Sequence, residues 1–212
     1  GDGIDGDDDP IVISAGSITI NSIEDDVKAL KSDAAITISG GNVNITVAGD
    51  QSKGIKSDSD ITLSGGNITM LASGDAVLEE SGAGYDPSYC TAIKGETTVI
   101  IDGCNLEITT TGKASRGISS DGDIEIISGI VNIISSGDGE KYTNELGEDD
   151  AYHGVCLKTD YDMTILNGTL TMSNSGSGGK VISSDGILVI GSLNYGPDME
   201  LTSSGESIEI TP

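Results

Sequence analysis

The sequence has no tryptophan, no phenylalanine and few basic residues. Its 212 residues include 35 acidic side chains but only 10 lysines and arginines, which gives a formal net charge of −25. Because phosphate backbones and anionic lipid surfaces are also negative, this balance argues against nucleic acid and membrane surfaces as partners. It favours cations, or a partner that is neutral or bridged by cations.

Other absences argue against a membrane segment, a zinc site and a catalytic histidine. No run of 18 apolar residues occurs, so we expect no membrane insertion, and any export signal is expected to lie outside this chain. Cys90, Cys104 and Cys156 lack the spacing of a zinc site, and we interpret them as small core residues, with one disulfide left open. The single histidine, His153, has no recognisable nucleophile and carboxylate partners, and we interpret it as a loop residue.

What the sequence does contain is a repeat. The stretch from Gly54 to Met70 matches the stretch from Ala29 to Ile45, 25 residues earlier, position for position. An apolar anchor recurs in steps of 26, 25, 38, 25, 39 and 25 residues, at Ile4, Leu30, Ile55, Ile93, Ile118, Leu157 and Ile182. An unbroken period leaves no room for a domain boundary, so we predict one domain over residues 1–212.

Each repeat carries two short apolar alternations. After Ile55 they are Ile61 with Leu63 and Ile68 with Met70, and the glycines at 65 and 66 lie between them. Period-two alternation is typical of strands with one buried face, and β-branched residues and glycine turns fit the same reading. Repeats of this size stack in parallel at about 4.8 Å. The sequence therefore predicts an all-β solenoid, a single-stranded right-handed parallel β-helix of about seven rungs, with Asn42, Asn67 and Asn105 stacked at one corner.

Charged residues recur with the same period as the anchors. An acidic residue stands three positions after every anchor, at Asp7, Asp33, Asp58, Glu96, Asp121, Asp160 and Asp185. A lysine stands one position after four of the anchors, at Lys31, Lys56, Lys94 and Lys158. In an extended segment both kinds share the outer face. Carboxylates about 4.8 Å apart repel by roughly 1–4 kcal/mol per pair, so either lysine pairs with backbone caps or metal ions must offset the repulsion.

The metal alternative has three candidate clusters. Four carboxylates are expected to stack on consecutive repeats, from Asp121, Asp123, Asp160 and Asp162. A second cluster is Asp5, Asp7 and Asp9, and a third is Asp58 with Asp60. Hard oxygen ligands in such numbers suit Ca²⁺, which accepts six to eight of them.

Two insertions, at about 71–89 and 135–152, interrupt the period. They carry many acids and four of the six tyrosines, Tyr85, Tyr89, Tyr142 and Tyr152. Both leave after the second alternation of a repeat, so they are expected to emerge on the same side as one wall. They are either solvated loops or the side of a groove in which tyrosine rings stack on sugar faces.

The repeats resemble those of a known family. The strings from Asp26 to Asn42, from Gly54 to Asn67 and from Arg116 to Ile124 look like the repeats of secreted carbohydrate-binding β-helix proteins, best known from cellulose-degrading clostridia and common in gut Bacteroidetes. The resemblance extends through about Ile190. It implies a right-handed parallel β-helix, similar in shape to pectate lyases, that binds Ca²⁺ and plant cell-wall polysaccharides such as cellulose or acidic pectin. By implication, calcium would be sought at Asp58, Asp121, Asp123, Asp160 and Asp162.

We therefore expect a secreted or cell-surface module that binds a polysaccharide or acts in adhesion, as a monomer without catalytic residues. One alternative is a calcium-dependent polysaccharide lyase with Lys56, Lys94 or Lys158 as base, although neighbouring carboxylates raise a lysine's pKa and oppose that role. Another is a purely structural adhesin stalk.

Overall fold

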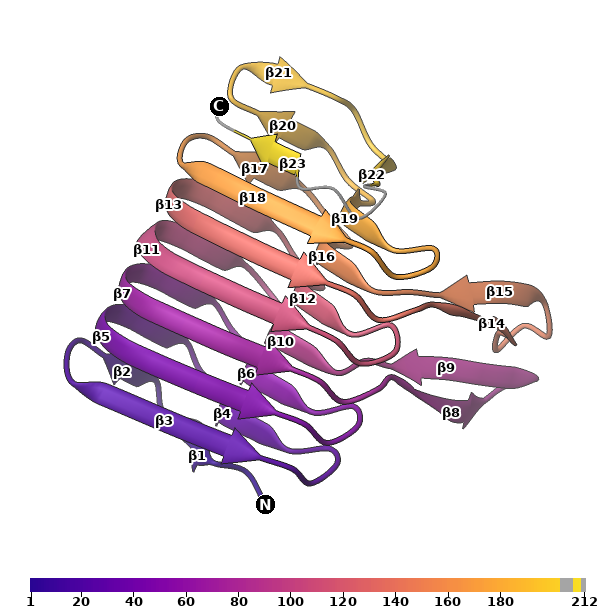
Figure 1. Ribbon diagram of the computed structural model, residues 1–212, viewed down its shortest axis with the longest axis horizontal. Helices are drawn as coiled ribbons and strands as arrows, with labels where there is room; N and C mark the ends of the chain where they lie inside the picture. The colour runs from indigo at the N-terminus through magenta and orange to yellow at the C-terminus, as the bar shows by residue number, and fades with distance from the viewer. Residues whose placement is uncertain (203–207, 211–212) are drawn as a thin grey trace.

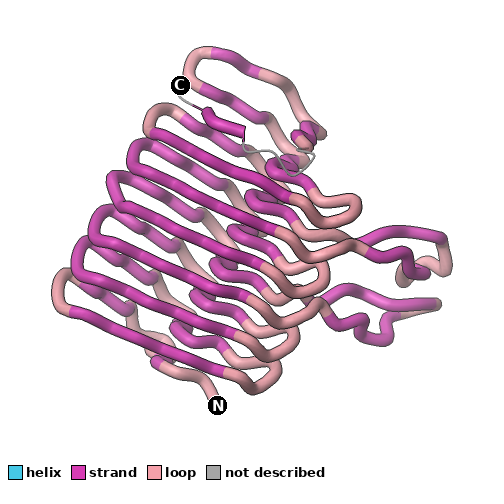
Figure 2. Tube along the Cα trace, viewed as in Figure 1, coloured by secondary structure: helices cyan, strands magenta, loops and turns pink. Residues whose placement is uncertain are grey.

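The computed structural model describes residues 1–202 and 208–210, and every regular element in that part of the chain is a β-strand (Figure 2). The strands form two large sheets, in which most neighbours are parallel, and two short antiparallel hairpins. The predicted all-β class is confirmed. Within the described residues, no helix has the length and apolar character needed to cross a membrane.

The first sheet contains one short strand from each of the seven repeats and an antiparallel strand, β22 (Met199–Leu201), at its end. In spatial order its strands are β1 (Ile4–Asp5), β4 (Lys28–Ser32), β6 (Lys53–Ser57), β10 (Thr91–Gly95), β12 (Arg116–Ser120), β16 (Val155–Thr159), β19 (Lys180–Ser184) and β22. Predicted anchors lie directly opposite one another, as Ile55 does with Leu30 and with Ile93. The same pairing links all seven anchors, so the predicted register is confirmed.

The second sheet contains the longer strands. Its main path is β2 (Ile11–Ile13), β5 (Ile36–Val47), β7 (Ile61–Ala72), β11 (Val99–Thr110), β13 (Ile124–Ser135), β17 (Met163–Ile165), β20 (Leu188–Ile190) and β21 (Leu193–Asn194). Off this path, β3 (Ser17–Ser22) pairs with β5, and β18 (Thr169–Asn174) pairs with β13 and with β23 (Ile208–Ile210). The chain passes from one sheet to the other in every repeat, so residues far apart in sequence become neighbours (Figure 1).

The two strands predicted for each repeat join into one strand in four repeats. β5, β7, β11 and β13 each run for 12 residues through the predicted glycine corner. Gly41 and Gly66 take φ values of +88° and +83° there, and the ladder slips locally between Ile38 and Asn42. The glycines bend the strand without ending it, because pairing resumes beyond the slip.

The core lies between the two sheets. Inward side chains from every repeat, among them Leu30, Ile55, Ile93 and Leu106, form one continuous apolar cluster and are fully buried. The three cysteines are free and buried in this cluster, so their interpretation as core residues is confirmed and no disulfide forms.

The predicted asparagine corner is present. The side-chain amide of Asn67 donates to Oδ1 of Asn42 at 3.0 Å, and that of Asn105 donates to Oδ1 of Asn67 at 3.4 Å. These bonds run from repeat to repeat, so they reinforce the backbone ladders.

The two insertions form the hairpins β8 (Val77–Ser81) with β9 (Gly84–Ser88), and β14 (Glu140–Thr143) with β15 (Asp149–Tyr152). They project side by side from one edge of the stack (Figure 1). The amide of Ala83 donates to the carbonyl of Glu145 at 2.8 Å, so the predicted single wall is confirmed. The predicted bounds were too early, because residues 71–72 and 135 belong to β7 and β13.

Candidate functional site

Acidic residues follow the first sheet in a row, one from each repeat. The backbone amide of Asp58 donates to the carbonyl of Ser32 at 3.2 Å, and that of Asp121 donates to the carbonyl of Gly95 at 3.0 Å. Equivalent bonds recur at Glu96, Asp160 and Asp185, and the amide of Asp33 donates to the carbonyl of Asp7 at 2.8 Å. The predicted alignment of acids along the stack is therefore confirmed.

Lysines on the same face pair with this row. Lys158 Nζ lies 2.7 Å from Asp160 and 2.8 Å from Asp185, so one ammonium group joins the acids of two repeats. Similar pairs are Lys31 with Asp5 and Asp33, Lys56 with Asp58 and Glu96, and Lys94 with Asp121. Of the two ways to offset the repulsion, lysine pairing is thus the one whose groups lie in contact.

The contact with Lys94 changes the pKa of Asp121. Burial acts to raise the pKa of this carboxyl, but hydrogen bonds with Lys94 and Glu96 and the charge of Lys94 outweigh it, so the pKa lies below its usual value. Asp121 is therefore ionised at neutral pH.

The predicted four-carboxylate calcium cluster does not assemble. Asp123 Oδ1 accepts the backbone amide of Asp162 at 3.1 Å, and Asp162 Oδ1 accepts the amide of Ile187 at 2.8 Å. Asp121 and Asp160 face lysines instead. Asp60 likewise accepts the hydroxyl of Thr97 at 2.7 Å, while Asp58 pairs with Lys56. Among the described residues, no group of three or more potential ligands includes any of these six aspartates.

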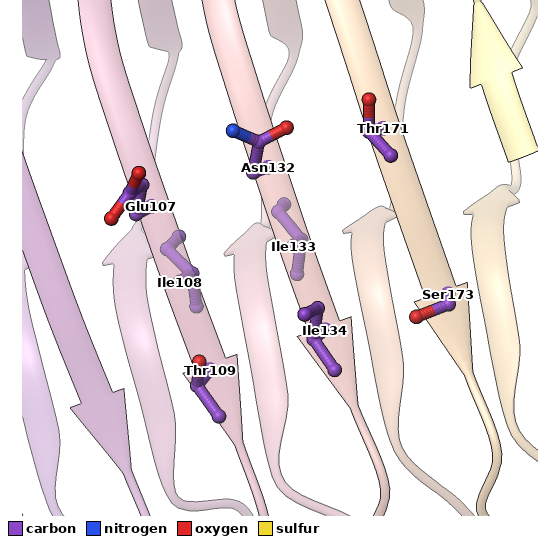
Figure 3. A pocket seen from close by; sticks show the side chains of 8 residues that line it. All are labelled: Glu107, Ile108, Thr109, Asn132, Ile133, Ile134, Thr171 and Ser173. Carbon is purple, nitrogen blue, oxygen red and sulfur yellow. The ribbon is translucent and has the colours of Figure 1, made fainter. Parts of the chain in front are cut away.

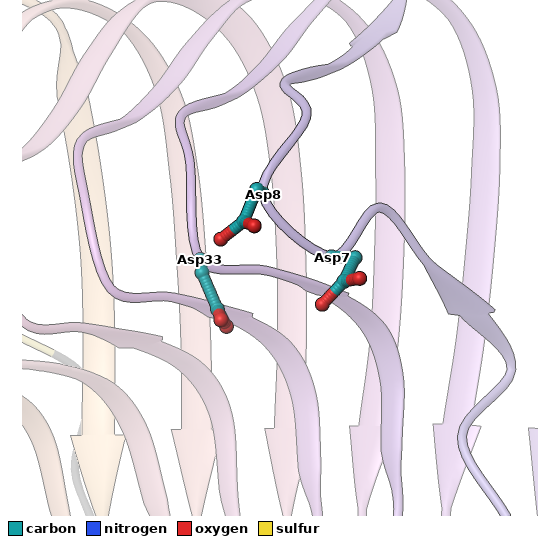
Figure 4. A group of neighbouring side chains, drawn as sticks. All are labelled: Asp7, Asp8 and Asp33. Atoms are coloured by element: carbon teal, nitrogen blue, oxygen red, sulfur yellow. The ribbon is translucent and has the colours of Figure 1, made fainter.

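One group of carboxylates does converge, in the first repeat. Ligand atoms of Asp7, Asp8 and Asp33 all lie within 4.8 Å of one another on the exposed surface (Figure 4). Of the predicted set Asp5, Asp7 and Asp9, only Asp7 belongs to it: Asp5 accepts the amide of Asp7, and the backbone carbonyl of Asp9 accepts the hydroxyl of Ser32 at 2.7 Å. Three carboxylates with open sides suit a hard cation such as Ca²⁺ whose shell is completed by water.

The sequence interpretation missed a second row of aspartates. Oδ1 of Asp50 accepts the amide of Asp75 at 2.8 Å, and Oδ1 of Asp75 accepts the amide of Lys113 at 2.7 Å. Asp25 and Asp138 make the same bond to the next repeat. A Gly-Asp pair recurring at 49–50, 74–75 and 137–138 was the signal for this row. These side chains cap backbone groups where the chain turns between the sheets.

The predicted tyrosines have different surroundings. Tyr142 and Tyr152 pack edge to face with ring centroids 5.6 Å apart, and Tyr152 is only 4% exposed. Burial raises the pKa of Tyr142 to about 12. Tyr85 is 40% exposed near the hairpin tips, and Tyr89 lies at the root of the first hairpin. Tyr142 and Tyr152 thus hold the second hairpin together, Tyr89 is partly buried against the same small cluster, and Tyr85 is the most exposed of the four.

A cleft of about 410 Å³ lies between the first hairpin and the outer face of the first sheet. It is lined by Lys53, Asp86, Pro87, Ser88, Tyr89, Thr91, Lys94, Arg116, Ser119, Asp121 and Asp160. A smaller hollow adjoins it at Tyr89 and Arg116 and reaches His153 and Lys180. Burial, and then the charge of Lys180, lower the pKa of His153, so the imidazole is neutral at pH 7.

Lys53 connects the floor of this cleft to its wall. Its Nζ donates to the carbonyl of Tyr89 at 2.6 Å and to that of Gln51 at 2.7 Å. Burial lowers the pKa of this lysine to about 8. The cleft therefore holds a partly desolvated cation that is bound by carbonyls rather than by a carboxylate.

A second hollow, of about 360 Å³, lies on the outer face of the second sheet (Figure 3). Two rows of side chains border it, Glu107, Asn132 and Thr171 on one side and Thr109, Ile134 and Ser173 on the other. It offers hydroxyl, amide and carboxylate groups beside the apolar side chain of Ile134.

Comparison with known proteins places the chain in a family. A family model described as "Carbohydrate-binding domain-containing protein" matches residues 1–139. The match includes the first hairpin and strands β6, β10 and β12, and therefore Lys53, Tyr89 and Arg116. Neither the curated proteins nor the solved structures gave a match. Because the match spans more than half of the 212 residues, the chain belongs to the family of carbohydrate-binding domain-containing proteins.

Proposed function

We propose that this protein is a non-catalytic module that binds a polysaccharide in the cleft between the first sheet and the first hairpin. The observation that carries the proposal is the cleft itself, in which polar side chains from β6, β10 and β12 face the hairpin root at Tyr89. Carbohydrate binding by the family supports the same function. Directional donors and acceptors on rigid strands are what recognition of sugar hydroxyl and carboxyl groups requires.

The architecture in this proposal is a single-stranded, right-handed parallel β-helix of about seven rungs. Parallel pairing of successive repeats and the regular passage of the chain between two sheets support it. Such a stack provides an elongated, rigid surface, as repeat proteins do. The polymer is a plant cell-wall polysaccharide such as cellulose or pectin, and the module works as a monomer that is secreted or held at the cell surface.

Bound calcium is part of the proposal, at Asp7, Asp8 and Asp33. Their convergence supports a cation there: Lys31 Nζ lies 3.7 Å from Asp33, but Asp7 and Asp8 have no described basic partner to offset their repulsion. The ion would hold the first repeat to the second, since Asp7 and Asp8 precede β2 whereas Asp33 follows β4.

The lyase alternative requires an unprotonated base beside the substrate. Lys56 and Lys158, two of the predicted bases, each contact two carboxylates, and Lys94 contacts Asp121. Burial acts to lower the pKa of Lys56, but its contacts with Asp58 and Glu96 raise it overall. These surroundings favour a binding role over proton abstraction.

Two experiments test the proposed function. A glycan array should show binding to one or more cell-wall polysaccharides, whereas no binding to any of them would favour the structural stalk. Incubation with polygalacturonate should give no ultraviolet absorbance from unsaturated uronate. Steady product formation that Lys94→Ala abolishes would instead establish a lyase.

A further inference from the structure

Most basic residues of this acidic chain pair with a carboxylate, and two of the three exceptions lie in the cleft. Seven of the ten lie within 4.0 Å of a carboxylate, namely Lys28, Lys31, Lys56, Lys94, Lys113, Lys158 and Lys180. Lys53, Lys141 and Arg116 have no such partner among the described carboxylates. Lys53 and Arg116 both line the cleft beneath the first hairpin, whereas Lys141 lies on β14.

Arg116 is fixed in place but has few hydrogen-bond acceptors. Its guanidinium carbon lies 3.3 Å from the centroid of the Tyr89 ring, so the two groups are in direct contact. Nε is buried and is the only such side-chain nitrogen or oxygen in the described part of the chain without a partner. Nη1 makes one long contact, 3.4 Å from the hydroxyl of Ser119. A guanidinium has five N–H donors; Nε is buried, so the donors left for a ligand are those of Nη1 and Nη2, which make only the one long contact with Ser119.

No described carboxylate lies within ion-pair distance of Arg116. Asp86, Asp121 and Asp160 also line the cleft; the carboxylate of Asp121 is bound by Lys94 and feels the charge of Arg116, and that of Asp160 is bound by Lys158. Arg116 also covers the face of Tyr89 that its guanidinium contacts, which opposes sugar stacking on that face. Recognition at this point of the cleft is therefore ionic rather than aromatic.

We propose that Arg116 is the specificity-determining residue of the cleft, and that it selects a polysaccharide whose sugars carry an anionic group. The planar fork of a guanidinium matches a carboxylate in a bidentate pair, and its contact with Tyr89 orients the fork in advance. Lys53 adds a second positive charge to the same cleft. The anionic group is either the carboxylate of a uronic acid or a sulfate ester, which share this charge. This inference rests on the proposed function, because it names the ligand class of the same cleft.

The test compares charged with neutral ligands, and the oligogalacturonate and its methyl ester are the matched pair. Calorimetry on the wild-type protein measures the affinity for an oligogalacturonate, for its methyl ester, for a sulfated oligosaccharide and for a neutral cello-oligosaccharide. We expect the acid to bind about tenfold or more tightly than its ester, and added salt to weaken that binding. A sulfated ligand that binds more tightly than the uronate would identify sulfate as the source of the charge.

Variants then assign the effect to one residue. Arg116→Gln should lose about tenfold or more in affinity for the acid and little for the ester, and Arg116→Lys should recover only part of the loss. Lys141→Gln is the matched control, because it removes an unpaired cation outside the cleft and should change neither affinity.

The outcomes separate the two proposals. Wild-type affinity for the acid and for the sulfated ligand that is no higher than for the neutral ligands, or an unchanged preference for the charged ligand in a folded Arg116→Gln, overturns the inference and leaves carbohydrate binding standing. No binding to any of the four ligands overturns the proposed function itself.

Discussion

The ammonium group of Lys53 lies 2.6 Å from the backbone carbonyl of Tyr89 and thereby joins the first sheet to the root of the first hairpin. The same ammonium group donates a second bond to the carbonyl of Gln51 at 2.7 Å, which holds the side chain against the segment that precedes β6. Lys53 therefore helps to hold the cleft wall in place, together with the contact of Arg116 with the Tyr89 ring.

Replacing Lys53 with methionine should loosen the root of the first hairpin. The variant keeps most of the side-chain volume but leaves two carbonyls without their charged donor, a change of about 1–3 kcal/mol in local stability. Hydrogen exchange of the amides in β8, β9 and Thr91 should become faster, while exchange in β4 and β5 stays unchanged. Lys141→Met, on the other hairpin, is the control. Equal protection of the β9 amides from hydrogen exchange in wild type and in Lys53→Met would contradict the conclusion that Lys53 holds the first hairpin to the first sheet.

The free energy of unfolding should depend on pH because folding lowers the pKa of Lys53. Burial lowers the pKa of Lys53 from 10.5 to about 8, so between these values the unfolded chain binds a proton that the folded chain has released. The free energy of unfolding therefore rises with pH across this window, relative to a variant that cannot titrate there. Below pH 8 the folded protein carries the full unfavourable effect of the buried charge.

Urea unfolding of wild type and Lys53→Met at several pH values tests this. The stability of wild type minus that of the variant should grow by about 1–3 kcal/mol from pH 8 to pH 10.5. Burial raises the pKa of the neighbouring Cys90 to about 11, so that thiol stays neutral over most of the window. A difference that does not change with pH would mean that the carbonyls of Gln51 and Tyr89 stabilise the ammonium enough to cancel its burial.

The fold could be predicted from the sequence because the repeat supplies its own alignment. Once Leu30, Ile55 and Ile93 occupy equivalent positions, period-two alternation fixes which side chains face inward, and stacking fixes the register. Glycine at 41 and 66 indicated a bend correctly but not its type, because a bulge and a true corner both require positive φ.

The site could be predicted only in part. The row of acids follows from the period, but whether Asp123 accepts a metal or the amide of Asp162 depends on side-chain direction, which spacing does not specify. The insertions break the period, so the contact of Arg116 with Tyr89 joins a repeat to a loop with no counterpart in other repeats. The repeat pattern does not predict contacts between a repeat and an insertion, so the cleft could be identified only from the structure.

A row of glycines should be essential to the stack. At Gly112 an added Cβ would lie 1.8 Å from the carbonyl oxygen of Gly74, and at Gly74 it would lie 1.9 Å from that of Gly49. Neighbouring repeats are held about 4.8 Å apart by their ladders, so the backbone cannot withdraw from the clash without losing hydrogen bonds. Gly112→Ala should therefore lower the free energy of unfolding by more than about 3 kcal/mol, measured by thermal or urea unfolding.

Gly103→Ala is the informative control for this prediction. Gly103 has a φ of +100°, yet an added Cβ would meet nothing closer than 3.6 Å, so only backbone strain of about 1–2 kcal/mol is expected. An equal or larger effect at Gly103 would show that conformation, not close approach between repeats, is the reason for glycine in this fold.

Calcium should stabilise the first repeats through Asp7, Asp8 and Asp33. Adding Ca²⁺ to chelator-treated protein should raise Tm by several degrees, because an ion that binds only the folded chain stabilises it by mass action. Asp8→Asn removes one of the three charged ligands and should abolish most of that rise. In the absence of calcium the same variant should be as stable as wild type or slightly more stable, because one repulsive charge has gone.

The variant Asp123→Asn tests whether Asp123 binds a metal ion or only accepts a backbone hydrogen bond. Its side chain accepts the amide of Asp162, and the amide oxygen of asparagine can still accept that bond, so the calcium-dependent rise in Tm should survive this change. If Asp123→Asn abolished the rise and Asp8→Asn did not, calcium would belong at the originally predicted cluster, and the carboxylates of Asp123 and Asp162 would have to leave their backbone partners to bind it. If both variants kept the full rise, neither cluster would be the site, and the stabilising ion would bind elsewhere on the chain.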